Sequence, residues 1–176
     1  PTLLVTYGGP WAENHFYSDS SPRYDKKLNR FTPYPDIANR THRRFWAHKD
    51  EYTYDEIAAA ALKIIRAGGL VGIGAHGQLQ GLGYHWEMWA YAMGGMSPAE
   101  ILRAATVDAA RIIGAPDDLG SIETGKLADL VILNSNPLDS IRNSTDIDRV
   151  MQNGRLFDGD TLDQQWPEQV PFPTSW

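Results

Sequence analysis

The sequence predicts an α/β fold in which two parallel strands are joined by a long connection that contains a helix. Two short apolar runs, residues 2–7 and 70–75, are typical of buried strands. Helix signals lie between the two runs, and a strand–helix–strand order is typical of a parallel sheet. The second run ends at His76, and a titratable residue at the carboxyl end of a strand is how α/β barrels build active sites.

The composition is that of an ordinary globular protein. The 176 residues are 42% hydrophobic and 22% charged, which argues against disorder. They are too few for a complete eight-stranded barrel, which needs about 200–250 residues. The net charge of −6 argues against nucleic-acid binding, and the absence of cysteine excludes disulfides and thiolate metal sites. Because no run of about 18 apolar residues is present, we expect a soluble protein, cytoplasmic or periplasmic, that does not insert into a membrane.

The chain begins in what reads as the middle of a strand, so we expect a piece cut from something larger. The first strand breaks at Gly8–Gly9–Pro10. Residues 8–53 then show no clean period and mix aromatic residues with prolines and charges. A loop of this length is typical of a functional lid or insertion. The alternative is an irregular surface excursion that its aromatic side chains hold in place.

A helix is predicted after this loop. Residues 53–56 have the pattern of a capping box, in which the Thr53 hydroxyl and the Glu56 carboxylate cap the first turn. Gly68–Gly69 ends the helix. Helical spacing predicts an apolar face made of Ile57, Ala61, Ile64 and Ile65.

Three more helices are predicted after the second strand. The first covers residues 86–93 and is stopped by Gly94–Gly95. The second begins at the capping box Ser97–Glu100, with Pro98 at the first helical position. A short third helix covers residues 107–113. The apolar face of the second helix is predicted to be Ile101, Leu102 and Ala105.

β-Structure follows these helices. Residues 128–133 read as a strand, and residues 147–152 and 155–157 read as a hairpin around Asn153–Gly154. Because these strands follow the helices and do not alternate with them, we expect them to form a separate small sheet. The tail from Asp160 is predicted to be irregular.

Four consecutive stretches carry a resemblance to a known family: residues 97–106, 109–114, 120–133 and 136–138. The run G-S-I-x-x-G-K-x-A-D-L-V within them is long and ordered, and is therefore specific. This part of the chain resembles the carboxyl-terminal part of the metal-dependent amidohydrolase superfamily, in its imidazolonepropionase- and prolidase-like branch. The resemblance covers about residues 70–157, close to half the chain.

The resemblance implies a (β/α)8 TIM barrel with a small β-sandwich. This chain would then be a partial barrel segment, with residues 2–7 and 70–75 as the last two barrel strands, plus the carboxyl-terminal strands of the sandwich. It divides into residues 1–118 (barrel, with the long loop 8–53), residues 119–159 (sandwich strands) and residues 160–176 (irregular tail). Lys126 and Asp129 are predicted to be structural, because they lie at a turn that enters a strand.

The resemblance also implies a chemistry, the hydrolysis of a carbon–nitrogen bond in a small amide or peptide-like substrate by a metal-activated water. The cofactor would be a divalent metal, with Zn²⁺ as the first candidate. The family's main ligands include a histidine pair of the form H-x-H, and no two of the five histidines have that spacing. We therefore expect the main ligands outside this chain and the isolated chain to be inactive. A missing amino-terminal part of the barrel, or another copy of the chain, would have to complete it.

His76 is the first candidate for the site. Where the family usually ends its last strand in aspartate, this chain reads Gly74–Ala75–His76–Gly77. Histidine can bind Zn²⁺ or act as a base, so His76 is predicted as metal ligand and catalytic residue. The alternative is a histidine that hydrogen-bonds a neighbouring loop.

Three further residues are candidates for the site. Tyr7 is predicted to line a substrate pocket at the mouth of the first strand, or else to pack. His85 and Glu87 are predicted to bind substrate or to support groups that do. The alternative is a plain helix start, with Glu87 near the positive end of the helix dipole and His85 exposed.

Two other possibilities stay open. The basic cluster made of Arg40, Arg43 and Arg44 could hold a substrate carboxylate, or could be a solvated loop face or a subunit contact. The rival to an enzyme is a non-catalytic interaction domain descended from an amidohydrolase, in which His76 marks a lost acid.

Overall fold

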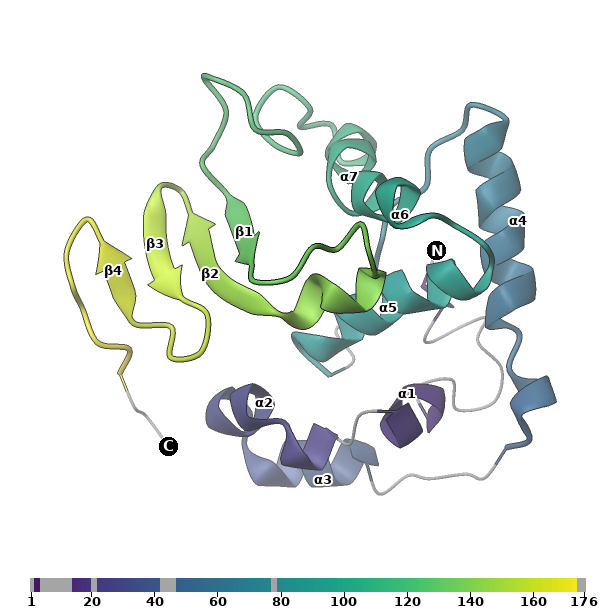
Figure 1. Cartoon of the computed structure of the whole chain (residues 1–176), viewed down its shortest axis with the longest axis horizontal. Coiled ribbons are helices and arrows are strands. Elements are labelled where there is room, and N and C mark those ends of the chain that lie inside the picture. The colour runs from purple at the N-terminus through teal and green to yellow at the C-terminus, as the bar shows by residue number, and fades with distance from the viewer. Residues whose placement is uncertain (1, 4–13, 20–21, 42–46, 77–78, 174–176) are drawn as a thin grey trace.

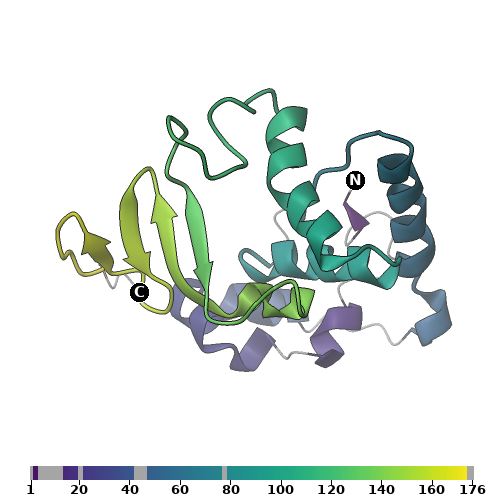
Figure 2. The same ribbon diagram turned by 45° about the horizontal axis from the view of Figure 1, so that its top comes forward.

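The computed structural model describes residues 2–3, 14–19, 22–41, 47–76 and 79–173. Helices make up most of the chain as far as residue 112, and a four-stranded antiparallel sheet follows. In both views of the molecule the sheet lies at one end and α4 at the other, with α5 between them (Figures 1 and 2). Within the described residues, no helix combines the length and the apolar character needed to cross a lipid bilayer.

The segment 8–53, predicted as a long loop, forms short helices over most of the part that the structure describes, so the loop prediction was wrong there. The segment forms α1 (Asn14–Asp19), η2 (Pro22–Tyr24), α2 (Lys26–Phe31), α3 (Tyr34–Thr41) and η3 (Lys49–Glu51). Asp25 caps α2 by accepting the Leu28 amide at 2.7 Å. Phe16, Leu28 and Ile37 are buried and pin the segment to the rest of the chain. Helices this short contain too few turns to reveal a helical period in the sequence.

Helix α4 (Tyr54–Arg66) begins directly after Thr53 and ends before Gly68–Gly69, as predicted. Gly68 and Gly69 donate their amides to the carbonyls of Ile65 and Ile64, both at 2.9 Å, and Gly68 has the φ of +86° that favours glycine. The predicted capping box is wrong, because Thr53 makes no side-chain cap hydrogen bond.

The predicted apolar face of α4 is confirmed except at one residue. Ala61 is buried, and Ile57 and Ile65 are partly buried against the core, whereas Ile64 is 52% exposed. The buried side chains of α4 also include Tyr54, Ala58 and Leu62. A Cβ placed on Gly94, at the end of α5, would lie 2.3 Å from the Cβ of Ala58, so small residues let the two helices approach closely.

The segment 70–75 belongs to no strand, so its prediction as a strand was wrong at the level of secondary structure. The Ile73 amide donates to the Ala104 carbonyl at the end of α6, at 3.3 Å. A parallel barrel strand needs hydrogen-bonding neighbours on its sides. Of the predicted strand at 2–7, only Thr2 and Leu3 lie within the described residues.

Three helices follow as the sequence predicted. Helix α5 (Leu82–Met93) starts four residues earlier than expected, and α7 (Val107–Ile112) ends one residue earlier. Helix α6 (Pro98–Ala105) has the predicted capping box, in which the Ser97 hydroxyl accepts the Glu100 amide and the Glu100 carboxylate accepts the Ser97 amide.

The sheet contains β1 (Leu130–Leu133), β2 (Ile147–Gln152), β3 (Arg155–Asp158) and β4 (Gln164–Trp166) in that spatial order, with η4 (Ile141–Thr145) leading into β2. The hairpin turn at Asn153–Gly154 is confirmed, with φ of 47° and 78°. Strand β4 lies in the tail predicted to be irregular, and that prediction was wrong there. Three residues followed by Pro167 carry too little pattern to predict a strand, and β4 forms because the edge of β3 offers it hydrogen bonds.

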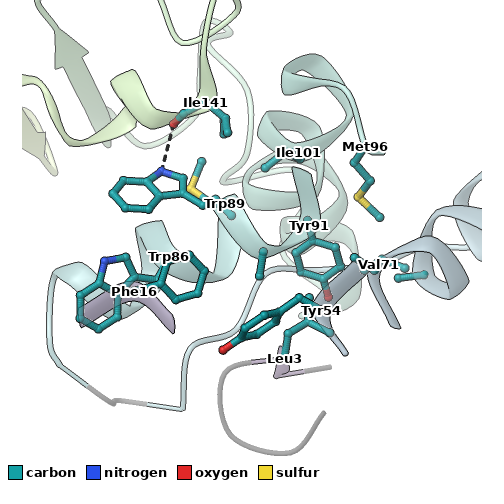
Figure 3. Close-up of a cluster of buried hydrophobic side chains, with 14 of the residues drawn as sticks. Leu3, Phe16, Tyr54, Val71, Trp86, Trp89, Tyr91, Met96, Ile101 and Ile141 are labelled. Atoms are coloured by element: carbon teal, nitrogen blue, oxygen red, sulfur yellow. Dashed lines mark hydrogen bonds between the residues drawn. The ribbon is translucent and has the colours of Figure 1, made fainter. Parts of the chain in front are cut away.

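The core lies around α5, and the sheet has none of its own. Trp86, Trp89 and Tyr91 of α5 are buried among side chains from distant parts of the chain, including Leu3 and Ile101 (Figure 3). No side chain of the four strands is buried. The helical part therefore has a hydrophobic core, whereas the sheet exposes apolar side chains.

Candidate functional site

Of the four predicted site residues, the structure describes His76, His85 and Glu87. Tyr7 lies outside the described residues. His76 closes the segment 70–76 as an exposed residue with a φ of 51°. His85 and Glu87 lie in α5, which begins six residues after His76. Because α5 begins at Leu82, Glu87 lies in its second turn and the alternative of a first-turn dipole partner is wrong.

His85 is largely buried against η4. Its Nδ1 lies 3.0 Å from the hydroxyl oxygen of Ser144, a residue that is itself 5% exposed. Burial lowers the pKa of the His85 imidazole from 6.5 to about 4. His85 is therefore neutral near pH 7, and it is not the exposed helix-start residue of the alternative prediction.

Trp89 and Ser144 complete this contact between α5 and η4. The Trp89 indole donates to the Ile141 carbonyl at 3.2 Å (Figure 3) and to the Ser144 hydroxyl at 3.4 Å. The Arg142 guanidinium lies 4.5 Å from the Trp89 ring centroid, within the range of a cation–π interaction. Sequence reasoning missed Ser144, because a serine in a short polar run gives no signal of a partner 59 residues away.

Glu87 is fully buried and reaches the amino-terminal segment. Its Oε1 accepts the Leu3 amide at 2.7 Å. Tyr91 lies one turn further along α5 and is also fully buried. Burial and the nearby Glu87 carboxylate raise the pKa of the Tyr91 phenol well above its usual range. The Tyr91 hydroxyl has no hydrogen-bond partner among the described residues.

Among the residues that the structure describes, no three His, Cys, Asp or Glu side chains lie close enough together to hold a metal ion. His15 packs in an aromatic cluster, with its ring centroid 4.9 Å from Phe16 and 5.3 Å from Tyr52. His48 caps η3. The described part of the chain therefore does not fit a complete metal centre. The Arg40 side chain, Arg43 and Arg44 lie outside what the structure describes.

Lys126 and Asp129 have structural roles, as predicted. The Lys126 ammonium donates to the Pro116 carbonyl and to the Ser121 hydroxyl, both at 2.7 Å. The Asp129 carboxylate accepts the Asn153 amide at the hairpin turn, at 2.6 Å.

Comparison with known proteins settles the family. Residues 37–157, which include the His76 turn, α4 to α7 and most of the sheet, match the sequence model described as "Amidohydrolase family". The chain belongs to the amidohydrolase family. This confirms the resemblance on which the sequence analysis relied.

The individual relatives match over short stretches. The chain is 39% identical over 64 residues to the imidazolonepropionase of Shouchella clausii, which is 35% of this chain and 14% of that protein. It is 54% identical over 41 residues to the imidazolonepropionase of Symbiobacterium thermophilum, 23% of this chain and 10% of that protein.

Two solved structures share the fold of the matched part. One is a Xaa-Pro dipeptidase with bound methionine in the active site, with a TM-score of 0.52 and 30% identity over 58% of this chain and 25% of that one. The other is molinate hydrolase, with a TM-score of 0.50 and 31% identity over 67% of this chain and 29% of that one. The match thus spans less than a third of the length of any of these four proteins.

Proposed function

We propose that this chain is the carboxyl-terminal segment of a metal-dependent hydrolase that cleaves a carbon–nitrogen bond in a small amide or peptide-like substrate. The observation that carries the proposal is the family match over residues 37–157. Relatives named imidazolonepropionase and Xaa-Pro dipeptidase support the bond type. The partial coverage of those relatives supports a segment of a longer catalytic unit.

In this proposal residues 2–7 and residues 70–75, which form no strand in this chain, take the places of the last two strands of a TIM barrel when the rest of the barrel is present, and β1 to β3 belong to a small β-sandwich. His76 serves as metal ligand or base at the barrel mouth, where its exposed imidazole is accessible to a substrate. Tyr7 and His85 line the substrate pocket, and Glu87 holds the segment that carries Tyr7 through the Leu3 amide. His85 is neutral near pH 7, so it offers hydrogen bonds and no charge.

The proposed cofactor is a divalent metal, with Zn²⁺ as the first candidate. The described residues supply no complete ligand set. The sequence also has no H-x-H pair, so this proposal places the main ligands in a part of the enzyme outside this chain. The isolated chain is therefore inactive in this proposal.

The exposed sheet supports the proposal that another polypeptide segment completes the fold. Val131 is 58% exposed and Trp166 is 60% exposed. A groove of about 560 Å³ lies on one face of the sheet, and its lining includes Val150, Phe157 and Phe172. An apolar surface of this kind is typical of an interaction site. A missing amino-terminal part of the barrel, or a second copy of the chain, would cover it.

The function is tested by comparing the 176-residue chain with the longest natural polypeptide that contains it. Bound metal is measured by mass spectrometry, and hydrolysis is measured with Xaa-Pro dipeptides and small cyclic amides. We expect stoichiometric bound metal and turnover in the longer protein, and neither in the 176-residue chain. Stoichiometric Zn²⁺ with turnover in the 176-residue chain would contradict the proposal that the chain is incomplete.

The role of His76 is tested in the longer protein. His76→Ala should lower kcat/KM at least about 100-fold if the imidazole is a ligand or base. His48→Ala, which removes another exposed histidine, is the matched control and should leave kcat/KM within about twofold. An unchanged rate in His76→Ala would favour the rival function, a non-catalytic interaction domain.

A further inference from the structure

Glu87 is a fully buried carboxylate in the middle of α5, a helix in which seven of twelve residues are buried. The other buried polar residues that the structure describes are Asp108 and Ser144. Asp108 is paired with the guanidinium groups of Arg103 and Arg111, which lie in the two consecutive helices α6 and α7. The hydrogen bond of Glu87 to the Leu3 amide, in contrast, spans 84 residues of sequence.

This hydrogen bond is short and directional. The distance of 2.7 Å between the Leu3 nitrogen and Glu87 Oε1 lies at the short end of the range for charge-assisted hydrogen bonds. A buried carboxylate is strongly destabilising unless hydrogen bonds satisfy it. The Leu3 side chain is also fully buried, beside Tyr54 and Tyr91 (Figure 3). Both the backbone and the side chain of Leu3 are therefore held against α5.

Residues 2–3 also lie beside the residues that precede His76. A Cβ placed on Gly74 would lie 3.8 Å from the Thr2 hydroxyl oxygen. Residues 2–3 thus run next to the residues that lead to the His76 turn. The Glu87 hydrogen bond fixes one of these two segments, and α5 itself begins soon after the other.

We infer that Glu87 is a positioning residue whose carboxylate fixes the amino-terminal segment against α5 and so sets its place beside the segment that ends at His76. Glu87 acts through the Leu3 backbone and does not touch substrate. The inference deepens the proposed function, because these two segments are the ones expected to deliver Tyr7 and His76 to the site. It explains why an acid is buried in α5 without assigning it a proton-transfer role.

Hydrogen exchange of the Leu3 amide in the 176-residue chain tests the inference without any activity assay. In the wild type this amide, followed by NMR, should exchange slowly, because it is buried and hydrogen-bonded. Glu87→Met keeps a long side chain without an acceptor and should speed Leu3 exchange by about 10- to 100-fold. Glu87→Gln keeps an acceptor oxygen and should restore most of the protection.

Asp108→Asn is the matched control, because it removes a different buried carboxylate and should leave Leu3 exchange unchanged relative to the amides of α5. Leu3 exchange at the rate of an unstructured peptide in the wild type would overturn the inference. So would an equal acceleration at every amide in Glu87→Met, since that would show a loss of global stability.

A second readout separates positioning from catalysis once an active longer protein is in hand. Glu87→Met should lower kcat at least about 10-fold, and Glu87→Gln should stay within about threefold of the wild type. An equal loss in both variants would overturn the inference, because it would assign the effect to the carboxylate charge. Absence of hydrolysis in the wild type would count against the proposed function and leaves the exchange result intact.

Discussion

The contact between His85 and Ser144 predicts that acid destabilises the protein through one histidine. The pKa of His85 is lowered from 6.5 to about 4 by burial, so the unfolded chain binds this proton more readily than the folded chain. The contribution of neutral His85 to stability is therefore complete above pH 6.5 and is lost as the pH falls from 6.5 towards 4. A shift of this size corresponds to roughly 3 kcal/mol in full, of which about 2–3 kcal/mol is lost by pH 4.5.

Burial gives the physical reason. His85 lies against η4 with its Nδ1 3.0 Å from the Ser144 hydroxyl oxygen, which also accepts the Trp89 indole N–H. Protonation of the imidazole places a positive charge in this largely buried site, where water does not solvate it fully.

Urea unfolding between pH 7.5 and pH 4.5 measures the effect. His85→Gln keeps a polar side chain that does not titrate, so its unfolding free energy should fall by about 2–3 kcal/mol less than that of the wild type over this range. Carboxylates that titrate in both proteins cancel in the comparison. His76→Asn, at an exposed histidine, is the matched control for the loss of one imidazole. Identical pH dependence in the wild type and His85→Gln would refute the reasoning.

Two further predictions concern packing and assembly. Gly94→Ala should lower the unfolding free energy by about 1–3 kcal/mol, because the new methyl group would lie 2.3 Å from Ala58 Cβ and 2.4 Å from the Ala59 nitrogen. The backbone of Gly94 has a φ of −84°, which alanine adopts freely, so an unchanged or higher urea midpoint would contradict the close approach of α4 and α5. The 176-residue chain should associate in light scattering, because the faces of its sheet are apolar and exposed, and Val131→Lys should lower the associated fraction. A monomer at all micromolar concentrations would contradict the proposed covering of the sheet.

The features that the sequence predicted well are those set by a few adjacent residues. The capping box of α6 needs only Ser97, Pro98 and Glu100, and the structure has each of the expected contacts. The hairpin turn needs only Asn153 and Gly154, whose positive φ values are the ones that these residue types tolerate. Such signals are read correctly because the atoms that interact are neighbours in the chain.

The predictions that were wrong concern features that depend on contacts between residues far apart in the sequence. The burial of Ala58 in α4 depends on Gly94, a residue at the end of α5 that lets the two helices approach closely. The spacing of apolar residues predicted Ile64 to be buried as well, and Ile64 is 52% exposed, because that spacing does not show which side another helix will approach. Strand β4 likewise exists because of its pairing with β3, in a tail whose own residues give no strand period.

In the candidate site, too, the sequence indicated the residues but not their distant partners. His85 and Glu87 were identified from their nearness to the His76 turn, but their partners Ser144 and Leu3 lie 59 and 84 residues away. No local pattern connects such pairs. The roles that the structure assigns to the two side chains, a neutral contact to η4 and an anchor for the amino-terminal segment, could therefore not be read from the sequence.

The register of the sheet puts apolar side chains on both of its faces. Leu130, Met151, Leu156 and Trp166 are paired across the strands and lie on one face, while Val131, Val150 and Phe157 are paired on the other. A sheet with one apolar face packs on one neighbour and leaves its polar face in water. A sheet that carries apolar side chains on both faces, none of them buried, has two faces to cover. The described helices have their own core around α5. In the proposed function, a missing amino-terminal part of the barrel or a second copy of the chain would therefore pack on both faces of the sheet.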